Sequence, residues 1–330
     1  MSSLPTVEIA INGAFITRRW EQPDNWMRLT RETGFPAHSF CGDVLDPFFS
    51  GDRAFQQEQA AAVKEAAKNY GVTICDYYTG VATHRFHGLS HSDARARERM
   101  ADWIMEAALL AVEMGTDLLG GHWDAFSCEV LADPQATESA MQRMFVTFRD
   151  LASRLRSTGI RALMQEQMYI PSEKPWTIAE CEEFLIKVNT EKGDSIPVMC
   201  TLDVGHMAGM HYGLKGRDLD YLEWLRQFGA CSEVIHLQQT TADASHHWPF
   251  TSEFNAKGDI SIEKTLEAVR ESHRNYANSP VSRVLPAVSH HWLVAELIPG
   301  STKTEDKILN ELKETSKYLR EYIPEGGLQL

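Results

Sequence analysis

Four side chains of the kind that bind hard metal ions stand at the ends of four short apolar segments in the second half of the chain. Glu166, Asp203, His236 and Glu296 each close such a strand-like run. A loop and then a helical pattern follow each one, the order typical of a (β/α) barrel, whose chemistry lies at the carboxyl ends of its strands. A single acidic residue at such a place is more often a helix cap or a solvated loop charge. Four in succession predict a shared divalent-cation site.

The spacing of these four residues agrees with a barrel. Glu166, Asp203 and His236 are each separated by about one βα unit, or about 31 residues when about 250 are divided over eight units. Glu296 follows His236 after nearly twice that interval. We therefore expect a long excursion after the seventh strand, through residues 240–259, and a second one around residues 278–289. The first contains Asp243 and His247 and is interpreted as part of the site wall or as a lid.

Eight strand-like segments alternate with helical patterns along the chain, which predicts an α/β fold, a (β/α)8 TIM barrel in one domain over residues 1–330. The strand-like segments begin near Val7, His38, Val72, Asp117, Ile160, Val198, Val234 and Trp292. The helical patterns include residues 54–69, 92–114, 136–157, 179–189, 219–228, 262–273 and 303–322. No linker, low-complexity stretch or repeat divides them.

The composition narrows the class of protein. A net charge of −14 argues against nucleic acid as a partner, because that affinity depends largely on Lys and Arg. No apolar run reaches the roughly 20 residues that span a bilayer, and the first residues lack the pattern of a signal peptide. We expect a cytoplasmic protein with no membrane partner, whose six scattered cysteines are reduced and packed. The oligomeric state stays open, with a homo-oligomer as one option.

Further candidates surround the four residues. His206, in the segment 203–206, could return to the same mouth, or instead cap a helix or pack on the rim. His122, at the end of the fourth strand, could bind a substrate hydroxyl or be a satisfied rim histidine. His84 and Arg85 follow the third strand and could receive a phosphate, or lie in a solvated loop. The full set of substrate-binding candidates is His206, His122, Gln238, His84, Arg85, Asp243 and His247.

These motifs resemble the xylose-isomerase-like superfamily of sugar phosphate isomerases and epimerases. The resemblance rests on the strand ends at Glu166 and Glu296, on Asp203 with His206, and on the run from His236 to Gln239. The superfamily also contains ketose 3-epimerases and endonuclease IV. Residues 236–240, 247–251 and 257–260 are similar to a subgroup that includes the tetrulose-phosphate epimerases of erythritol catabolism.

The resemblance implies a mechanism and a metal site. In ketose 3-epimerases a Glu, Asp, His, Glu quartet binds one divalent ion, and its two glutamates act as acid and base. By motif these residues are Glu166, Asp203, His236 and Glu296, with Glu166 and Glu296 catalytic. One departure concerns an arginine that those epimerases commonly place shortly after the metal histidine, where this chain has Thr240 to Asp243. The identity of the substrate therefore does not transfer.

The chemistry of the residues agrees with that implication. A divalent ion acting as a Lewis acid would stabilise an enediolate, while one glutamate removes a proton and the other returns it. Return to the opposite face gives epimerisation of a small ketose or ketose phosphate, and return to the next carbon gives aldose–ketose isomerisation. The resemblance to the subgroup implies a tetrulose phosphate as one such substrate. Three carboxylates and one imidazole suit Mn²⁺ best, then Mg²⁺ or Co²⁺, and Zn²⁺ less well.

Other functions stay open. The same base could begin an elimination in a lyase that acts on an oxidised sugar, of the C-glycoside-cleaving type. A phosphodiesterase like endonuclease IV would need a histidine-rich, multi-metal mouth and a basic groove, which the charge of −14 disfavours. A metal-free sugar-binding module is the alternative that is not an enzyme.

Overall fold

Eight parallel strands form a closed barrel in the computed structural model, which describes residues 4–80, 83–190 and 193–330. The strands are β1 (Thr6–Asn12), β2 (Ala37–Cys41), β3 (Thr73–Tyr78), β4 (Leu118–Gly121), β5 (Ala162–Glu166), β6 (Val198–Asp203), β7 (Val234–Leu237) and β10 (His290–Ala295). Each strand pairs with the next one along the barrel, and β10 pairs with β1 to close it. The predicted TIM barrel is confirmed, and its strands begin within about two residues of the expected positions.

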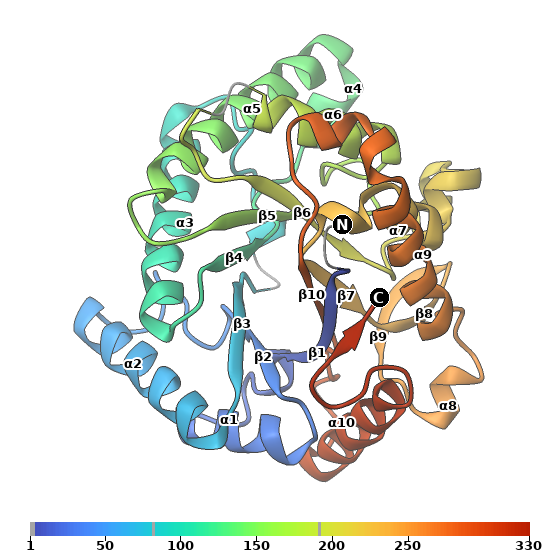
Figure 1. Cartoon of the computed structure of the whole chain (residues 1–330). Helices are drawn as coiled ribbons and strands as arrows, with labels where there is room; N and C mark the ends of the chain where they lie inside the picture. The colour runs from blue at the N-terminus through green and yellow to red at the C-terminus, as the bar shows by residue number, and fades with distance from the viewer. Residues whose placement is uncertain (1–3, 81–82, 191–192) are drawn as a thin grey trace.

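Helices surround the barrel on its outside (Figure 1). The longer ones are α1 (Pro23–Glu32), α2 (Arg53–Tyr70), α3 (Ala94–Met114), α5 (Pro134–Leu155), α6 (Ile178–Asn189), α7 (Tyr221–Phe228), α9 (Ile262–Asn275) and α10 (Glu305–Arg320). Side-chain caps begin several of them: Asp52 accepts a hydrogen bond from the Phe55 amide at the start of α2, and Thr177 does the same for Glu180 in α6. Gly71 ends α2 with a φ of 63°, a conformation that glycine adopts at little cost.

The interior of the barrel changes character along its axis. Toward the amino-terminal ends of the strands it is filled by small and aliphatic side chains, a cluster of Ala10, Ala37, Cys75, Leu118, Ala162, Met164, Met199, Val234 and Val294. Toward the carboxyl ends the strands present Glu166, Asp203 and His236 instead. The apolar layer therefore supports a polar layer above it, as in other packed barrels.

The expected excursion after the seventh strand is a folded hairpin. Its two antiparallel strands are β8 (Gln239–Thr241) and β9 (Ala244–Trp248), followed by the short helix α8 (Ser252–Asn255). The second excursion contains the 3₁₀ turns η6 (Tyr276–Asn278) and η7 (Pro280–Arg283). The long interval between His236 and Glu296 thus contains ordered structure rather than an additional barrel unit.

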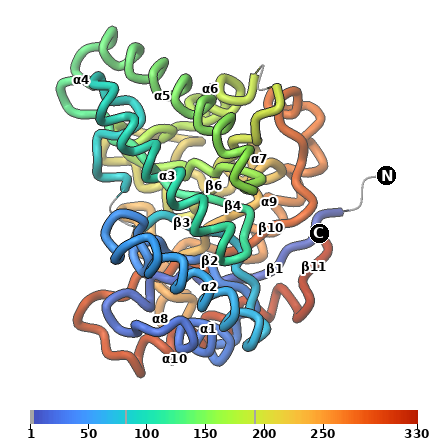
Figure 2. Tube along the Cα trace, turned by 90° about the vertical axis from the view of Figure 1, so that its left-hand side faces the viewer, coloured from blue at the N-terminus to red at the C-terminus, as the bar shows by residue number. Residues whose placement is uncertain are grey.

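The segment β11 (Leu328–Gln329) pairs antiparallel with the start of β1, so residues near both chain ends lie together on one side of the molecule (Figure 2). The barrel mouth opens on the other side, where α4 (Cys128–Ala132) and α8 lie. None of the described helices is long and apolar enough to cross a membrane. All six cysteines lie in the described residues and are free, and only Cys128 is exposed.

Candidate functional site

The barrel brings Glu166, Asp203, His236 and Glu296 together at its mouth. One ligand atom from each residue lies within 4.8 Å of those of the other three. Register explains this convergence, because Asp203 lies directly opposite His236 on the neighbouring strand. Glu296 follows the last residue of β10, and its amide donates to the Leu237 carbonyl at 2.8 Å. All four side chains are buried.

The geometry of this cluster fits a single metal ion. His236 Nδ1 lies 3.3 Å from Glu166 Oε1, 3.4 Å from Glu296 Oε2 and 3.9 Å from Asp203 Oδ2. Ligands held at about 2.1 Å by one octahedral ion would lie about 3 to 4.2 Å apart. Glu166 Oε1, His236 Nδ1 and Glu296 Oε2 have no hydrogen-bond partner among the described residues. Buried polar atoms rarely lack a partner, so these atoms fit a bound cation that would satisfy them.

The electrostatics of the cluster also favour a cation. Burial disfavours the charged form of His236, but the carboxylates of Glu296 and Glu166 outweigh it and hold the pKa of His236 well above its usual value. Burial raises the pKa of Asp203 to about 6, and the negative charges of Glu296 and Glu166 add to this effect. Three carboxylates close together in a low dielectric repel one another, and a positive charge among them relieves that repulsion. Because a coordinating histidine must be neutral, a metal ion would take the place of the proton on His236.

A second layer of side chains fixes the Asp203 carboxylate. Gln238 Nε2 donates to Asp203 Oδ1 and Oδ2 at 3.1 Å each, and the Gly205 amide donates to Oδ1 at 2.6 Å. Any side chain at position 205 would collide with Gln238, since a Cβ there would lie 2.3 Å from Gln238 Cδ. The glycine is therefore required for the close approach of Gln238, and such supporting contacts orient metal ligands.

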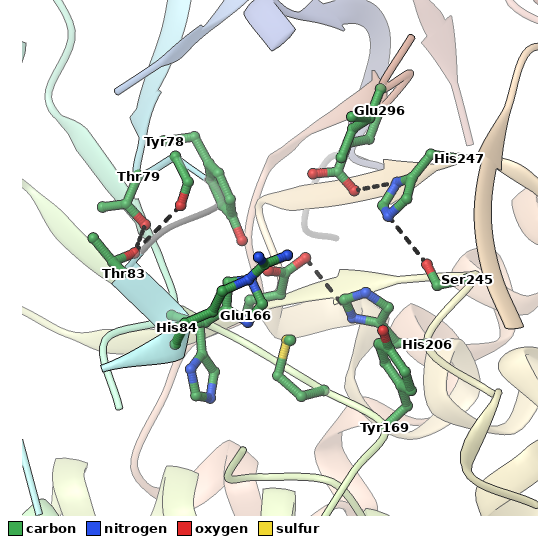
Figure 3. A pocket seen from close by; sticks show the side chains of 15 residues that line it. Tyr78, Thr79, Thr83, His84, Glu166, Tyr169, His206, Ser245, His247 and Glu296 are labelled. Carbon is green, nitrogen blue, oxygen red and sulfur yellow. Dashed lines mark hydrogen bonds and ion pairs between the residues drawn. The ribbon is translucent and has the colours of Figure 1, made fainter. Parts of the chain in front are cut away.

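A cavity of about 320 Å³ opens directly above the cluster and is lined by Glu166 and Glu296. Figure 3 shows its wall, with His247 directed toward Glu296 and His206 toward Glu166. His247 Nδ1 lies 3.3 Å from Glu296 Oε2, and His206 Nδ1 lies 3.8 Å from Glu166 Oε1. The volume is of the order of a small ligand, at the lower end of typical small-molecule sites.

Hydrogen bonds fix the positions of both His206 and His247. His206 Nδ1 donates to the Gln167 carbonyl at 2.7 Å. The His247 amide donates to Gln238 Oε1 at 2.7 Å, and its φ of 52° is uncommon for a residue other than glycine. The hairpin after β7 thus forms part of the cavity wall, as expected for that excursion.

His122, His84 and Arg85 line the same cavity on its other side. His122 Nε2 donates to the Lys174 carbonyl at 3.0 Å, and burial lowers the pKa of His122 to about 4. Burial also disfavours charge on His84, but its 2.9 Å hydrogen bond to Glu173 outweighs this effect and raises its pKa.

Two of the expected substrate-binding residues lie elsewhere. Gln238 is fully buried and does not line the cavity; it lies behind Asp203, as described above. Asp243 lies in the turn between β8 and β9, where its exposed carboxylate accepts from the Thr241 hydroxyl and lies 3.4 Å from His246 Nε2. The tight turn directs Asp243 to solvent. The sequence analysis expected the whole excursion to form part of the site wall, but Asp243 does not line the cavity.

Several residues of the cavity wall are not among the candidates that were predicted from the sequence. They include Tyr78, Thr79, Thr83, Met168, Tyr169, Ser245 and Ile298. Tyr78 packs its ring 4.6 Å from the His236 ring, and burial together with Glu166 and Glu296 holds the pKa of Tyr78 well above its usual value. Its position at the end of β3 was a signal available in the sequence, since strand ends supply the catalytic residues of such barrels.

Comparisons with known proteins agree with this fold. The family model described as xylose isomerase-like TIM barrel matches residues 27–279. A protein of Brucella abortus (strain 2308) named D-erythrulose 1-phosphate 3-epimerase is 28% identical over 264 residues, which cover 80% of this chain and 83% of that protein.

Solved structures of the same architecture match nearly the whole chain. A candidate xylose isomerase from Rhodospirillum rubrum matches with a TM-score of 0.80 and 19% identity, covering 96% of this chain and 100% of that one. D-psicose 3-epimerase from Clostridium cellulolyticum H10, solved with D-tagatose, matches with a TM-score of 0.67 and 16% identity over 95% and 98% of the two chains. At these identities the structural matches establish the fold.

The family model covers most of the barrel, including three of the four clustered residues, and the curated relative is itself named an epimerase. The resemblance to the xylose-isomerase-like superfamily is thereby confirmed. This chain belongs to the xylose isomerase-like TIM-barrel family.

Proposed function

We propose that this protein is a divalent-metal-dependent epimerase or isomerase of a small ketose or ketose phosphate. The observation that carries the proposal is the pair of buried glutamates, Glu166 and Glu296, which both line the cavity and both belong to the candidate metal cluster. The Brucella relative supports an epimerase of a four-carbon ketose phosphate, and the solved ketose epimerases share the fold.

Glu166, Asp203, His236 and Glu296 would hold the metal. Three carboxylates and one imidazole favour Mn²⁺, with Mg²⁺ and Co²⁺ next and Zn²⁺ less suited. When bound, the ion supplies Lewis acidity that makes the carbon next to a substrate carbonyl more acidic.

The two glutamates then divide the proton transfer between them. One carboxylate removes the proton from the carbon beside the carbonyl, and the other returns a proton to the opposite face. His247 Nδ1 lies 3.3 Å from Glu296 Oε2 and can orient that carboxylate. His206 Nδ1 lies 3.8 Å from Glu166 Oε1 and donates to the Gln167 carbonyl instead. Return of the proton to the neighbouring carbon would give isomerisation with the same residues.

The test is the exchange of substrate hydrogen for solvent deuterium. Ketoses of four to six carbons and their phosphates are incubated with Mn²⁺ in deuterated water, and NMR identifies the substrate, the labelled carbon and the product. The variants Glu166→Gln and Glu296→Gln should each lower the exchange rate by at least about 100-fold, the usual contribution of a general acid or base. Glu305→Gln, on the exposed start of α10, is the matched control and should leave the rate unchanged. Normal exchange in both cavity variants would refute the proposal, and release of an eliminated group would favour the lyase.

A further inference from the structure

The charges of the cavity are distributed unevenly, and their distribution indicates which substrate the site takes. The deep end holds the buried carboxylates of Glu166, Asp203 and Glu296 around His236. Even a bound divalent ion would leave this end with a net negative charge. A phosphate group carries between one and two negative charges near neutral pH, so the deep end repels it.

The rim of the cavity, in contrast, holds cations. Arg85 is exposed and lines the cavity, yet its guanidinium makes no hydrogen bond or ion pair with any residue in the described part of the chain. Most other arginines on this acidic protein are paired with carboxylates or carbonyl groups, as Arg161 is with Glu233. A guanidinium without a partner beside a cavity is free to bind a phosphate through two parallel hydrogen bonds.

His84 lies beside Arg85 and adds a second donor. Its Nδ1 donates to Glu173, whose side chain is itself buried, and this contact fixes the ring. Because Nδ1 is engaged, Nε2 is the atom left for a ligand, and no described residue bonds to it. The hydrogen bond to Glu173 also raises the pKa of His84 against the effect of burial, which favours the charged form that suits an anion.

His122 differs from both of these residues, because its hydrogen bond fixes it as an acceptor. A carbonyl oxygen can only accept, so His122 Nε2 carries the hydrogen in its bond to Lys174. The buried ring is neutral, so Nδ1 carries a lone pair, and Nδ1 has no partner among the described residues. An acceptor at that position binds a hydroxyl hydrogen and disfavours a phosphate or carboxylate oxygen.

We infer that the substrate is a phosphorylated ketose whose phosphate binds to Arg85 and His84 at the rim, while a hydroxyl group of the sugar donates to His122 Nδ1. This inference rests on the proposed function and extends it by selecting the phosphate ester over the free sugar. It also gives the two ends of the substrate different contacts, which fixes the direction in which the sugar enters.

The first experiment measures binding of inorganic phosphate to the full-length protein by ³¹P NMR, with Mn²⁺ and again with excess chelator. Binding should persist in chelator and should weaken by about tenfold or more in Arg85→Ala, since a hydrogen bond to a charged group is removed. Arg283→Ala is the matched control, because Arg283 is an exposed arginine in η7 at the other end of the barrel, also without a partner among the described residues. The inference would be overturned if phosphate binding were lost in excess chelator, or if Arg85→Ala bound phosphate as tightly as the wild type. Because no turnover is needed, this result is independent of the proposed function.

The second experiment compares kcat/KM for a ketose phosphate, the free ketose and the sugar acid of the same length. Arg85→Ala should lower the preference for the phosphate ester over the free ketose by about tenfold or more, and Arg85→Lys should lower it less. His122→Phe removes the acceptor, while the Lys174 carbonyl keeps its hydrogen bond from Gln165 Nε2. This variant should therefore lower kcat/KM for the phosphate ester and for the free ketose by the same factor. A wild-type preference for the free ketose or the acid, or an unchanged preference in Arg85→Ala, would overturn the inference.

Discussion

The two ends of the barrel hold their ionisable side chains in opposite ways. At the amino-terminal end, Arg161 donates to both oxygens of Glu233 at 2.8 Å each, and His291 bonds to Ser232 and His273 at 2.8 Å each. At the mouth, the facing atoms of Glu166, His236 and Glu296 have no hydrogen-bond partner among the described residues.

This difference separates groups that stabilise the fold from groups that are available for a ligand. Removing one partner of a buried ion pair is destabilising, because the other charge is then left buried without a partner. The paired groups also have little free hydrogen-bonding capacity for a ligand. Like charges that crowd together without partners are costly, and they cluster at functional sites. The predictions below test this distinction from the largest expected effect to the smallest.

The sharpest test compares one buried carboxylate from each end. Asp203→Asn should abolish the rise in thermal stability that Mn²⁺ gives the wild type, a stabilisation of about 2.7 kcal/mol at 100 times the dissociation constant. In excess chelator the same variant should lose little stability, because the loss of one of three repelling charges offsets the loss of one hydrogen bond from Gln238. Glu233→Gln should lose about 1 to 2 kcal/mol with or without Mn²⁺, since it breaks the contact with half-exposed Arg161.

Thermal unfolding with and without metal, combined with metal analysis of the purified chains, measures both effects. The comparison would fail if Glu233→Gln altered the response to Mn²⁺, or if Asp203→Asn retained a full response.

The second prediction concerns two adjacent glutamines with different partners. Gln238→Met removes the donor that fixes both oxygens of Asp203 and should weaken Mn²⁺ binding by about 10- to 100-fold. Gln239→Met is the matched control, because Gln239 is equally buried but bonds to Asn255 and Ile260 in the excursion. Metal titration should give Gln239→Met a wild-type affinity even if its unfolding midpoint falls. Equal Mn²⁺ affinities in the two variants would show that Gln238 does not support the metal site.

The smallest effect is a change in pH dependence at the amino-terminal end. Burial, together with the nearby His273, lowers the pKa of His291 to about 3, whereas an unfolded histidine titrates near 6.5. Between these values the unfolded chain binds a proton that the native state does not, so stability falls as the pH falls below about 6.5. The contribution of His291 is up to about 1.4 kcal/mol for each pH unit.

Urea unfolding of the wild type and His291→Asn at pH 7.5, 6.5 and 5.5 measures the slope. The variant should be less stable at every pH but should lose less stability on acidification. Parallel slopes would mean that His291 is not neutral in the native state.

Much of this arrangement could be predicted from the sequence because strand ends in a parallel barrel converge by register. Apolar runs that end in Glu166, Asp203 and His236 fix both the strands and the face on which these residues meet. The role of Gly205, which leaves space for Gln238, depends on the approach of a second strand end.

The other features of the site depend on contacts between segments that are distant in the sequence, and the spacing of residues does not reveal these contacts. Gln238 and Asp243 are close in the sequence, yet one turns inward to Asp203 and the other reaches solvent at the hairpin turn. The hydrogen state of His122 is set by Lys174, whose loop follows a different strand. Tyr78 lies next to His236 only because the barrel brings β3 across from β7. Such features require the tertiary structure.

The space shared by Gly205 and Gln238 has an evolutionary consequence. A methyl group at position 205 would overlap the amide of Gln238, so a lineage can change the glycine only after, or together with, a smaller residue at position 238. A smaller residue at 238 would in turn release the carboxylate of Asp203. The three positions are therefore expected to vary as a unit among homologous sequences, with few viable intermediates between one combination and another.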